Sequence, residues 1–184
     1  CAGCTTPFAR AALSPGQTTR VHFDDQGHER TFALHLPPEG ATTPRPLVVV
    51  LHGGGSSGLG MESVTGFSDV ADREGFVVVY PDGLGGPHGI GRAFNYQGCC
   101  GYSTIFGIDD FEMVRRLVVT LEDRLAIDPE RRYLVGYSNG GALAHGLSSR
   151  ASDIFAAAAI YAATTGATGT LEAPRYLDPL PDPP

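Results

Sequence analysis

The stretch YLVGYSNGG, residues 133–141, runs from a short apolar segment through a serine flanked by glycines into a segment rich in alanine and leucine. Residues 136–140 fit the pattern Gly-x-Ser-x-Gly, which alone is a weak signal in a chain with 25 glycines. A strand directly before this pattern and a helix directly after it are the setting of a nucleophile elbow, a sharp turn that exposes the serine hydroxyl. The stretch therefore predicts Ser138 as a nucleophile, against the alternative of a glycine-rich turn with a structural serine.

The segments around this motif predict an α/β fold. Continuous apolar runs are typical of strands that are buried on both faces, and four occur, at residues 47–51, 76–80, 133–136 and 155–161. Amphipathic or alanine-rich segments between them predict helices, at about residues 63–74, 111–125 and 139–149. Because strands and helices alternate along the chain, we expect a mostly parallel sheet.

An antiparallel hairpin is expected before the parallel part. Residues 21–23 and 31–36 alternate polar and apolar side chains, and Asp25-Gln26-Gly27 between them is suited to a turn. Residues 37–46 read as a loop. We expect one domain at residues 21–184, preceded by an exposed lead-in at residues 1–20.

The glycines after the first long apolar run are a second candidate part of the site. The sequence His52-Gly53-Gly54-Gly55 follows residues 47–51 directly. Backbone N–H groups in such a loop stabilise the negative charge that acyl transfer places on a carbonyl oxygen. We expect the N–H groups of Gly54 and Asn139 to form this oxyanion hole, with Gly55 as the near alternative to Gly54. A phosphate-binding loop is excluded because the chain contains no lysine.

The histidines supply no evident base for Ser138. We expect His52 to order the glycine loop. His145 lies seven residues after Ser138 on the same predicted helix, which places it about 10 Å away by helical rise. His88, in a loop rich in glycine and proline, is the one mobile candidate.

Composition and charge exclude several classes of partner. The net charge is −7 at pH 7, and the 13 basic residues, all arginine, form no cluster that could follow a phosphate backbone. We therefore expect no nucleic-acid partner. No stretch approaches the roughly 18 apolar residues of a membrane span. The spacing of cysteines and histidines offers no zinc site.

The N-terminal cysteines indicate an extracytoplasmic location. Ala2-Gly3-Cys4, followed by Thr5-Thr6-Pro7, resembles the lipobox that ends a bacterial lipoprotein signal peptide. This resemblance implies a lipid anchor on Cys4. The alternative is a plain exported tail in which Cys1 or Cys4 forms a disulfide.

From about residue 47 to residue 163 the chain resembles the secreted feruloyl-esterase and polyhydroxybutyrate-depolymerase-like esterases of the α/β-hydrolase superfamily. The resemblance rests on many short stretches in the same order. They are Leu51-His52-Gly53-Gly54-Gly55, Tyr80-Pro81-Asp82-Gly83, Phe94-Asn95 with Gly98-Cys99-Cys100, Ile108-Asp109-Asp110-Phe111, Ile127-Asp128-Pro129-Glu130-Arg131, Gly136-Tyr137-Ser138-Asn139-Gly140-Gly141 and Asp153-Ile154-Phe155-Ala156-Ala157.

The resemblance implies hydrolysis of carboxylic esters through an acyl-enzyme on Ser138, with no metal or organic cofactor. The implied substrates are feruloyl or acetyl esters of plant polysaccharide, or polyhydroxyalkanoate-type polyester. Two departures fall where an acyl pocket is expected: Phe94 stands where tryptophan is usual, and Tyr137 where methionine or leucine is common. The pair Cys99 and Cys100 is expected to hold a loop of the site through a disulfide whose pairing the sequence does not identify.

In this superfamily the nucleophile is followed along the chain by the triad acid and then by the histidine. No histidine follows His145 here. Asp109 and Asp110 precede Ser138 and are expected to begin a helix or order a loop. The domain is therefore expected to be incomplete after about its sixth strand, and residues 1–184 alone to be a poor esterase. The alternatives are a serine peptidase or acyltransferase on the same fold, and a catalytically inactive lipoprotein that binds a ligand.

Overall fold

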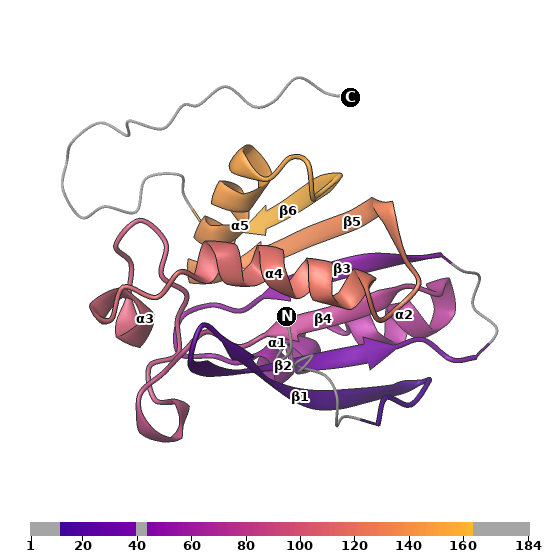
Figure 1. Ribbon diagram of the computed structural model, residues 1–184, viewed down its shortest axis with the longest axis horizontal. Coiled ribbons are helices and arrows are strands. Elements are labelled where there is room, and N and C mark those ends of the chain that lie inside the picture. The colour runs from indigo at the N-terminus through magenta and orange to yellow at the C-terminus, as the bar shows by residue number, and fades with distance from the viewer. Residues whose placement is uncertain (1–11, 40–43, 164–184) are drawn as a thin grey trace, which may run out of the picture.

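One mixed sheet organises the residues that the computed structural model describes, 12–39 and 44–163 (Figure 1). Its six strands lie in the order β1-β2-β4-β3-β5-β6. In chain order they are β1 (Gln17–Asp25), β2 (His28–Leu36), β3 (Arg45–Leu51), β4 (Val77–Pro81), β5 (Ile127–Tyr137) and β6 (Ala157–Tyr161). β2 pairs antiparallel with β1 and β4, whereas the pairs β4–β3, β3–β5 and β5–β6 are parallel. The predicted sheet, mostly parallel with an antiparallel start, is confirmed.

The limits of the strands differ from the predictions, most of all at β1 and β5. The hairpin turn consists of Gln26 and Gly27, both with positive φ (55° and 82°), the conformation that matches the twist of paired strands. β1 already begins at Gln17, within the predicted lead-in. β5 begins at Ile127, ahead of the predicted start at residue 133, because its first residue pairs with the beginning of β3.

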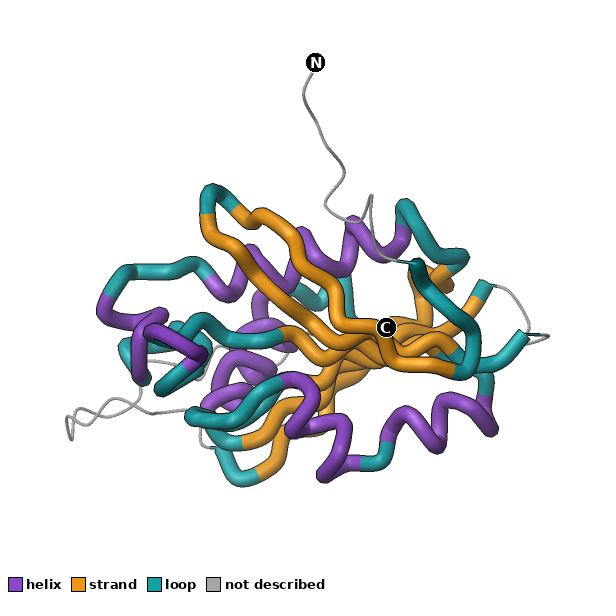
Figure 2. The backbone as a smooth tube through the Cα atoms, turned by 90° about the horizontal axis from the view of Figure 1, so that it is seen from below, coloured by secondary structure: helices purple, strands orange, loops and turns teal. Residues whose placement is uncertain are grey.

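Helices cover both faces of this sheet (Figures 1 and 2). They are α1 (Gly58–Thr65), α2 (Phe67–Glu74), α3 (Gly101–Ile105), α4 (Asp110–Glu122) and α5 (Asn139–Arg150), with a 3₁₀ turn η1 (Pro87–Gly89). The prediction of one helix over residues 63–74 is wrong. Gly66, in the left-handed conformation (φ 63°), ends α1 by donating its N–H to the Glu62 carbonyl and precedes α2.

The side chains of β3 alternate between two hydrophobic clusters. Leu47, Val49 and Leu51 pack in the cluster that contains α4 and α5, whereas Val48 and Val50 pack in the one that contains residues of α1 and α2. All five side chains are buried. This burial on both faces explains why residues 47–51 of the strand include no polar side chain.

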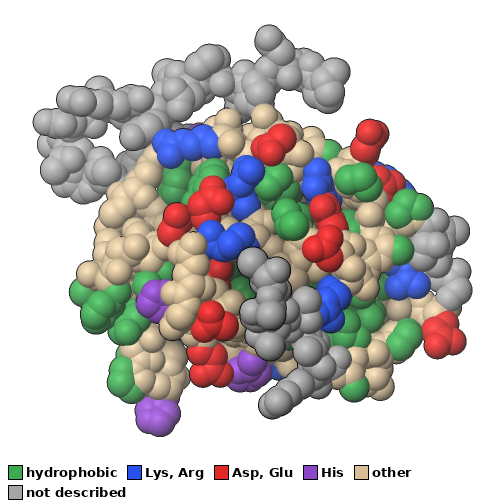
Figure 3. All heavy atoms as spheres, in the orientation of Figure 1, with side chains coloured by type: hydrophobic (Ala, Val, Ile, Leu, Met, Phe, Trp, Pro, Cys, Tyr) green, Lys and Arg blue, Asp and Glu red, His purple; other side chains and the backbone are tan. Residues whose placement is uncertain are grey.

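The outer face of α4 is polar. Figure 3 shows acidic and basic side chains interspersed over this face. Arg115 pairs there with Glu112 at 3.5 Å and with Asp153 at 3.4 Å.

At the far edge of the sheet, Tyr161 on β6 is 71% exposed. Among the described residues, no helix has the length and apolar character needed to cross a bilayer.

A buried ion pair joins the hairpin to α4. Arg30 on β2 and Asp110 at the first position of α4 form an ion pair, and both side chains are inaccessible to solvent. The second carboxylate oxygen of Asp110 accepts the Asn95 N–H at 2.6 Å. Nearby, Arg116 donates to both carboxylate oxygens of Asp25, at 2.7 and 3.1 Å. The expectation that Asp110 orders a loop agrees with these contacts.

We predict that Asp110→Asn lowers the free energy of unfolding by about 3–5 kcal/mol, because it leaves the Arg30 guanidinium as an uncompensated buried charge. Urea denaturation measures the loss. Asp109→Asn is the matched control: Asp109 caps α4 by accepting the Glu112 N–H at 3.0 Å, and asparagine caps equally well, so its effect should stay within about 0.5 kcal/mol. Equal losses in the two variants would show that the buried pair does not stabilise the fold.

Candidate active site

Ser138 occupies a sharp turn between β5 and α5. Its backbone has φ 51° and ψ −116°, a region that a residue with a Cβ adopts only when its surroundings impose it. The Ser138 N–H donates to the Tyr161 carbonyl at 2.9 Å, and the Ser138 carbonyl accepts the Ala142 N–H at 2.9 Å. The strand–turn–helix arrangement predicted around this serine is thus present.

Two glycines allow the turn to pack closely. A Cβ on Gly136 would lie 2.4 Å from the Gly140 carbonyl oxygen, and a Cβ on Gly140 would lie 2.5 Å from the His52 carbonyl oxygen. The Gly140 N–H donates to that same His52 oxygen at 3.1 Å. The start of α5 therefore lies directly against the end of β3.

The glycine loop after β3 lies beside the serine turn. A Cβ on Gly53 would be 3.3 Å from the Ser138 Cβ, and one on Gly54 would be 3.9 Å from the Asn139 Cβ. The Gly55 N–H donates to the Arg92 carbonyl at 2.6 Å, so it is already occupied. Within the described part of the chain the Gly54 N–H has no acceptor. Of the two candidate oxyanion donors in this loop, the geometry favours Gly54.

His52 links the loops after β3 and β4. The Gly83 N–H donates to its Nε2 at 2.9 Å, so the proton is on Nδ1, which donates to the Gly53 carbonyl at 2.7 Å. Burial lowers the pKa of the His52 imidazole, and the hydrogen bond to the Gly53 carbonyl opposes this only in part. With both nitrogens engaged and the ring neutral, His52 is not available to take a proton from Ser138.

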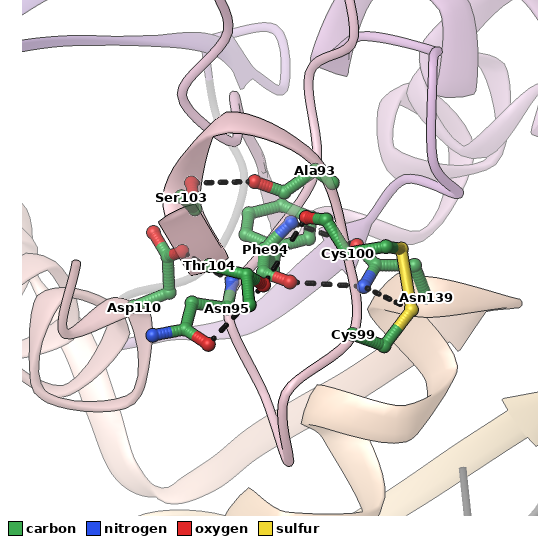
Figure 4. The surroundings of a disulfide bond; sticks show 9 residues. All are labelled: Ala93, Phe94, Asn95, Cys99, Cys100, Ser103, Thr104, Asp110 and Asn139. Atoms are coloured by element: carbon green, nitrogen blue, oxygen red, sulfur yellow. Dashed lines mark hydrogen bonds between the residues drawn. A yellow bond between two sulfur atoms is a disulfide. The ribbon is translucent and has the colours of Figure 1, made fainter. Parts of the chain in front are cut away.

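The Asn139 side chain fastens a second loop to the turn (Figure 4). Its Oδ1 accepts the Phe94 N–H at 2.7 Å, and its Nδ2 donates to the Phe94 carbonyl at 2.9 Å. The Phe94 ring is fully buried and lies 4.6 Å from the His52 ring. The sequence predicted only a backbone role for Asn139, because no local pattern connects residues 94–95 with residues 136–141.

The other position expected at an acyl pocket lies on the surface. Tyr137 is 42% exposed, and its ring stacks on that of Tyr161 with centroids 5.7 Å apart. A Cβ on Gly53 would touch this ring at 2.8 Å. Tyr137 thus flanks the glycine loop, whereas Phe94 supports it from below the surface.

Cys99 and Cys100 are joined to each other by a disulfide (Figure 4). The Cys100 sulfur would lie 4.0 Å from a Cβ on Gly54, and Asn139 Nδ2 lies 3.8 Å from the Cys99 sulfur. The pair therefore borders both candidate oxyanion donors. Cys4, the expected lipidation site, lies outside the described residues.

The remaining histidine candidates do not join Ser138. His88 is exposed in η1, with φ 58°, and His145 lies within α5, where its carbonyl accepts the hydroxyls of Ser148 and Ser149. No hydrogen bond joins a histidine to the Ser138 hydroxyl within residues 12–39 and 44–163. In the same residues, no group of three or more His, Cys, Asp or Glu side chains is placed to hold a metal ion.

The chain is similar to known esterases. It matches the family described as esterase PHB depolymerase over residues 30–170. It is 30% identical over 159 residues to NocK of Nocardia uniformis subsp. tsuyamanensis, which is named as an esterase, covering 84% of this chain and 44% of that protein. It is also 30% identical over 124 residues to feruloyl esterase B of Piromyces equi, covering 66% of this chain and 22% of that protein.

Solved structures share the fold. Acetyl xylan esterase from Aspergillus awamori superposes with a TM-score of 0.63 at 16% identity, covering 79% of this chain and 52% of that one. The chain thus spans about half or less of the length of these three proteins.

We predict that Gly140→Ala destabilises the protein by about 3 kcal/mol or more, because the new methyl group would overlap backbone at the end of β3. Gly54→Ala is the matched control: its Cβ would meet nothing nearer than 3.9 Å, so its unfolding free energy should stay within about 1 kcal/mol of wild type. Denaturant unfolding compares the two, and a tolerated Gly140→Ala would contradict the close approach.

Acid is expected to destabilise the fold through His52. Because burial lowers its pKa from 6.5, the unfolded chain binds more protons than the folded one below that pH, and stability falls as the pH drops. Unfolding free energies between about pH 5 and 8 should decline less steeply for His52→Gln, whose amide oxygen can still accept the Gly83 N–H but which has no titrating group. Identical slopes for variant and wild type would rule out this contribution.

Proposed function

The chain belongs to the esterase PHB depolymerase family, and we propose that it carries the nucleophile and the oxyanion hole of a serine carboxylic ester hydrolase. The observation that carries the proposal is the convergence of two loops. The strained Ser138 turn and the Gly54 N–H, which has no acceptor among the described residues, lie side by side where β5 and β3 end.

In the proposed reaction, Ser138 Oγ attacks the ester carbonyl carbon. The carbonyl oxygen becomes an oxyanion, and the N–H groups of Gly54 and Asn139 donate to it. The C–O bond to the alcohol then breaks, and the alcohol leaves with a proton as the acyl group stays on the serine. Water attacks the acyl-enzyme by the same route and releases the acid.

The attacking hydroxyl must lose its proton to a base within hydrogen-bond reach. His52 is engaged at both nitrogens, and neither His88 nor His145 bonds to Ser138. We therefore assign the base to none of these three histidines. The expectation that residues 1–184 alone are a poor esterase stays a prediction.

Two features support the remaining parts of the proposal. The disulfide between Cys99 and Cys100 supports export, since such bonds persist in oxidising compartments. The names of the related proteins support an acyl group esterified to a polysaccharide or within a polyester. A serine peptidase or acyltransferase would share the nucleophile and is separated from an esterase by rates on aryl esters, peptides and acyl acceptors.

We predict that Ser138→Ala in the full-length protein lowers kcat on p-nitrophenyl esters by at least about a thousandfold, because it removes the attacking oxygen while leaving binding intact. Ser148→Ala, on the same helix, is the control and should keep wild-type turnover. A Ser138→Ala variant with normal kcat would end the assignment of the nucleophile.

A further inference from the structure

A cavity of about 190 Å³ opens at the end of β4. Its polar side chains come from two elements: Glu29 and Thr31 on β2, and Asp82 and Arg92 on the loop after β4. Glycines of that loop make up much of the remaining wall. A wall of glycine backbone lets a ligand approach N–H and C=O groups closely.

Arg92 is the unusual member of this cavity. Its side chain is half-buried, and its guanidinium lies against Gly89, where a Cβ would be 2.5 Å from the Arg92 Cζ. In the part of the chain that the structure describes, this guanidinium makes no ion pair and no hydrogen bond to another side chain. A partly desolvated cation without acceptors is unfavourable, and oxygen atoms of a ligand would supply them.

The other polar groups restrict the ligand. Asp82 is already bound by the Gly58 N–H at 2.7 Å and by Thr31 and Arg20. Glu29 is exposed, and its Oε1 lies 2.9 Å from His22 Nδ1, which leaves its second carboxylate oxygen for a ligand. Two carboxylates in one cavity disfavour an anion, and an unpaired guanidinium disfavours an apolar group. Neutral hydroxyl groups suit the carboxylates and the guanidinium alike, because a hydroxyl can donate a hydrogen bond to a carboxylate and accept one from Arg92.

The cavity is tied to the proposed oxyanion loop through its own backbone. Gly83, which lines the cavity, donates its N–H to His52 at 2.9 Å, and the Arg92 carbonyl accepts the Gly55 N–H at 2.6 Å. In the strand order β4-β3-β5, the end of β4 lies two strands from the end of β5, or about 10 Å. A ligand group in the cavity is therefore separate from the acyl group at Ser138 but within reach along one extended molecule.

We propose that this cavity is a subsite for a neutral sugar residue of an oligosaccharide whose ester is presented to Ser138. The proposal rests on the proposed function and selects the polysaccharide ester over the polyester. Sugar hydroxyls would contact Arg92 and Glu29, while the acyl group lies at the glycine loop.

Binding of an oligosaccharide without ester groups tests the subsite apart from catalysis. Full-length protein carrying Ser138→Ala is titrated with xylotetraose by isothermal calorimetry, with and without Arg92→Gln, which keeps the backbone carbonyl that holds Gly55. We expect Arg92→Gln to weaken binding about tenfold. The matched control is Arg73→Gln, since Arg73 is exposed and its one bond among the described residues is to the Asp69 carbonyl on α2, and it should bind as tightly as the parent.

Kinetics on an otherwise wild-type chain provide the second arm. For Arg92→Gln, kcat/KM on an acetylated xylo-oligosaccharide should fall about tenfold more than kcat/KM on p-nitrophenyl acetate, mainly through KM. The subsite would be overturned if Arg92→Gln lowered kcat/KM equally on both substrates or left the affinity for xylotetraose unchanged. It would also be overturned if Arg92→Gln weakened the binding of a hydroxybutyrate oligomer instead of xylotetraose. Full esterase activity in Ser138→Ala would instead overturn the proposed function, while leaving the xylotetraose result readable.

Discussion

The contact between the start of α5 and the end of β3 is the constraint on which the candidate site depends. Gly140 donates its N–H to the His52 carbonyl at 3.1 Å, and a side chain at Gly140 would lie 2.5 Å from that oxygen. Because β5 and β3 are neighbouring parallel strands, the turns that follow them emerge at the same edge of the sheet. Parallel pairing and a missing Cβ together bring Ser138 beside the glycine loop.

Support for this contact comes from a loop and from the hairpin. The loop that carries Phe94 is held by the Asn139 amide on one side and by the Asp110 carboxylate, through the Asn95 N–H, on the other. Asp110 is neutralised in turn by Arg30, and a buried carboxylate needs such a partner. The antiparallel hairpin therefore contributes to the order of a site several strands away.

Strands and helices were predictable where their pattern lies in consecutive residues. The unbroken apolar run of β3 predicted burial on both faces, and both clusters receive its side chains. Prediction failed where one residue changes the backbone direction, as Gly66 does between α1 and α2. It also failed where pairing with a distant strand extends an element. The first residue of β5, Ile127, pairs with Arg45 of β3, so β5 includes the mostly polar residues 128–132 that follow it.

The sequence by itself determined the strand–turn–helix at Ser138, the glycine loop after β3 and the family to which the chain belongs, because each is written in short runs of neighbouring residues. Only the tertiary structure decided that the Gly55 N–H is occupied by Arg92, that both nitrogens of His52 are engaged, and that the Asn139 side chain holds Phe94. Three of these hydrogen bonds join segments that are far apart in the sequence: Gly55 with Arg92, His52 with Gly83, and Asn139 with Phe94. A local sequence pattern does not show which distant donor and acceptor folding will bring within about 3 Å of each other.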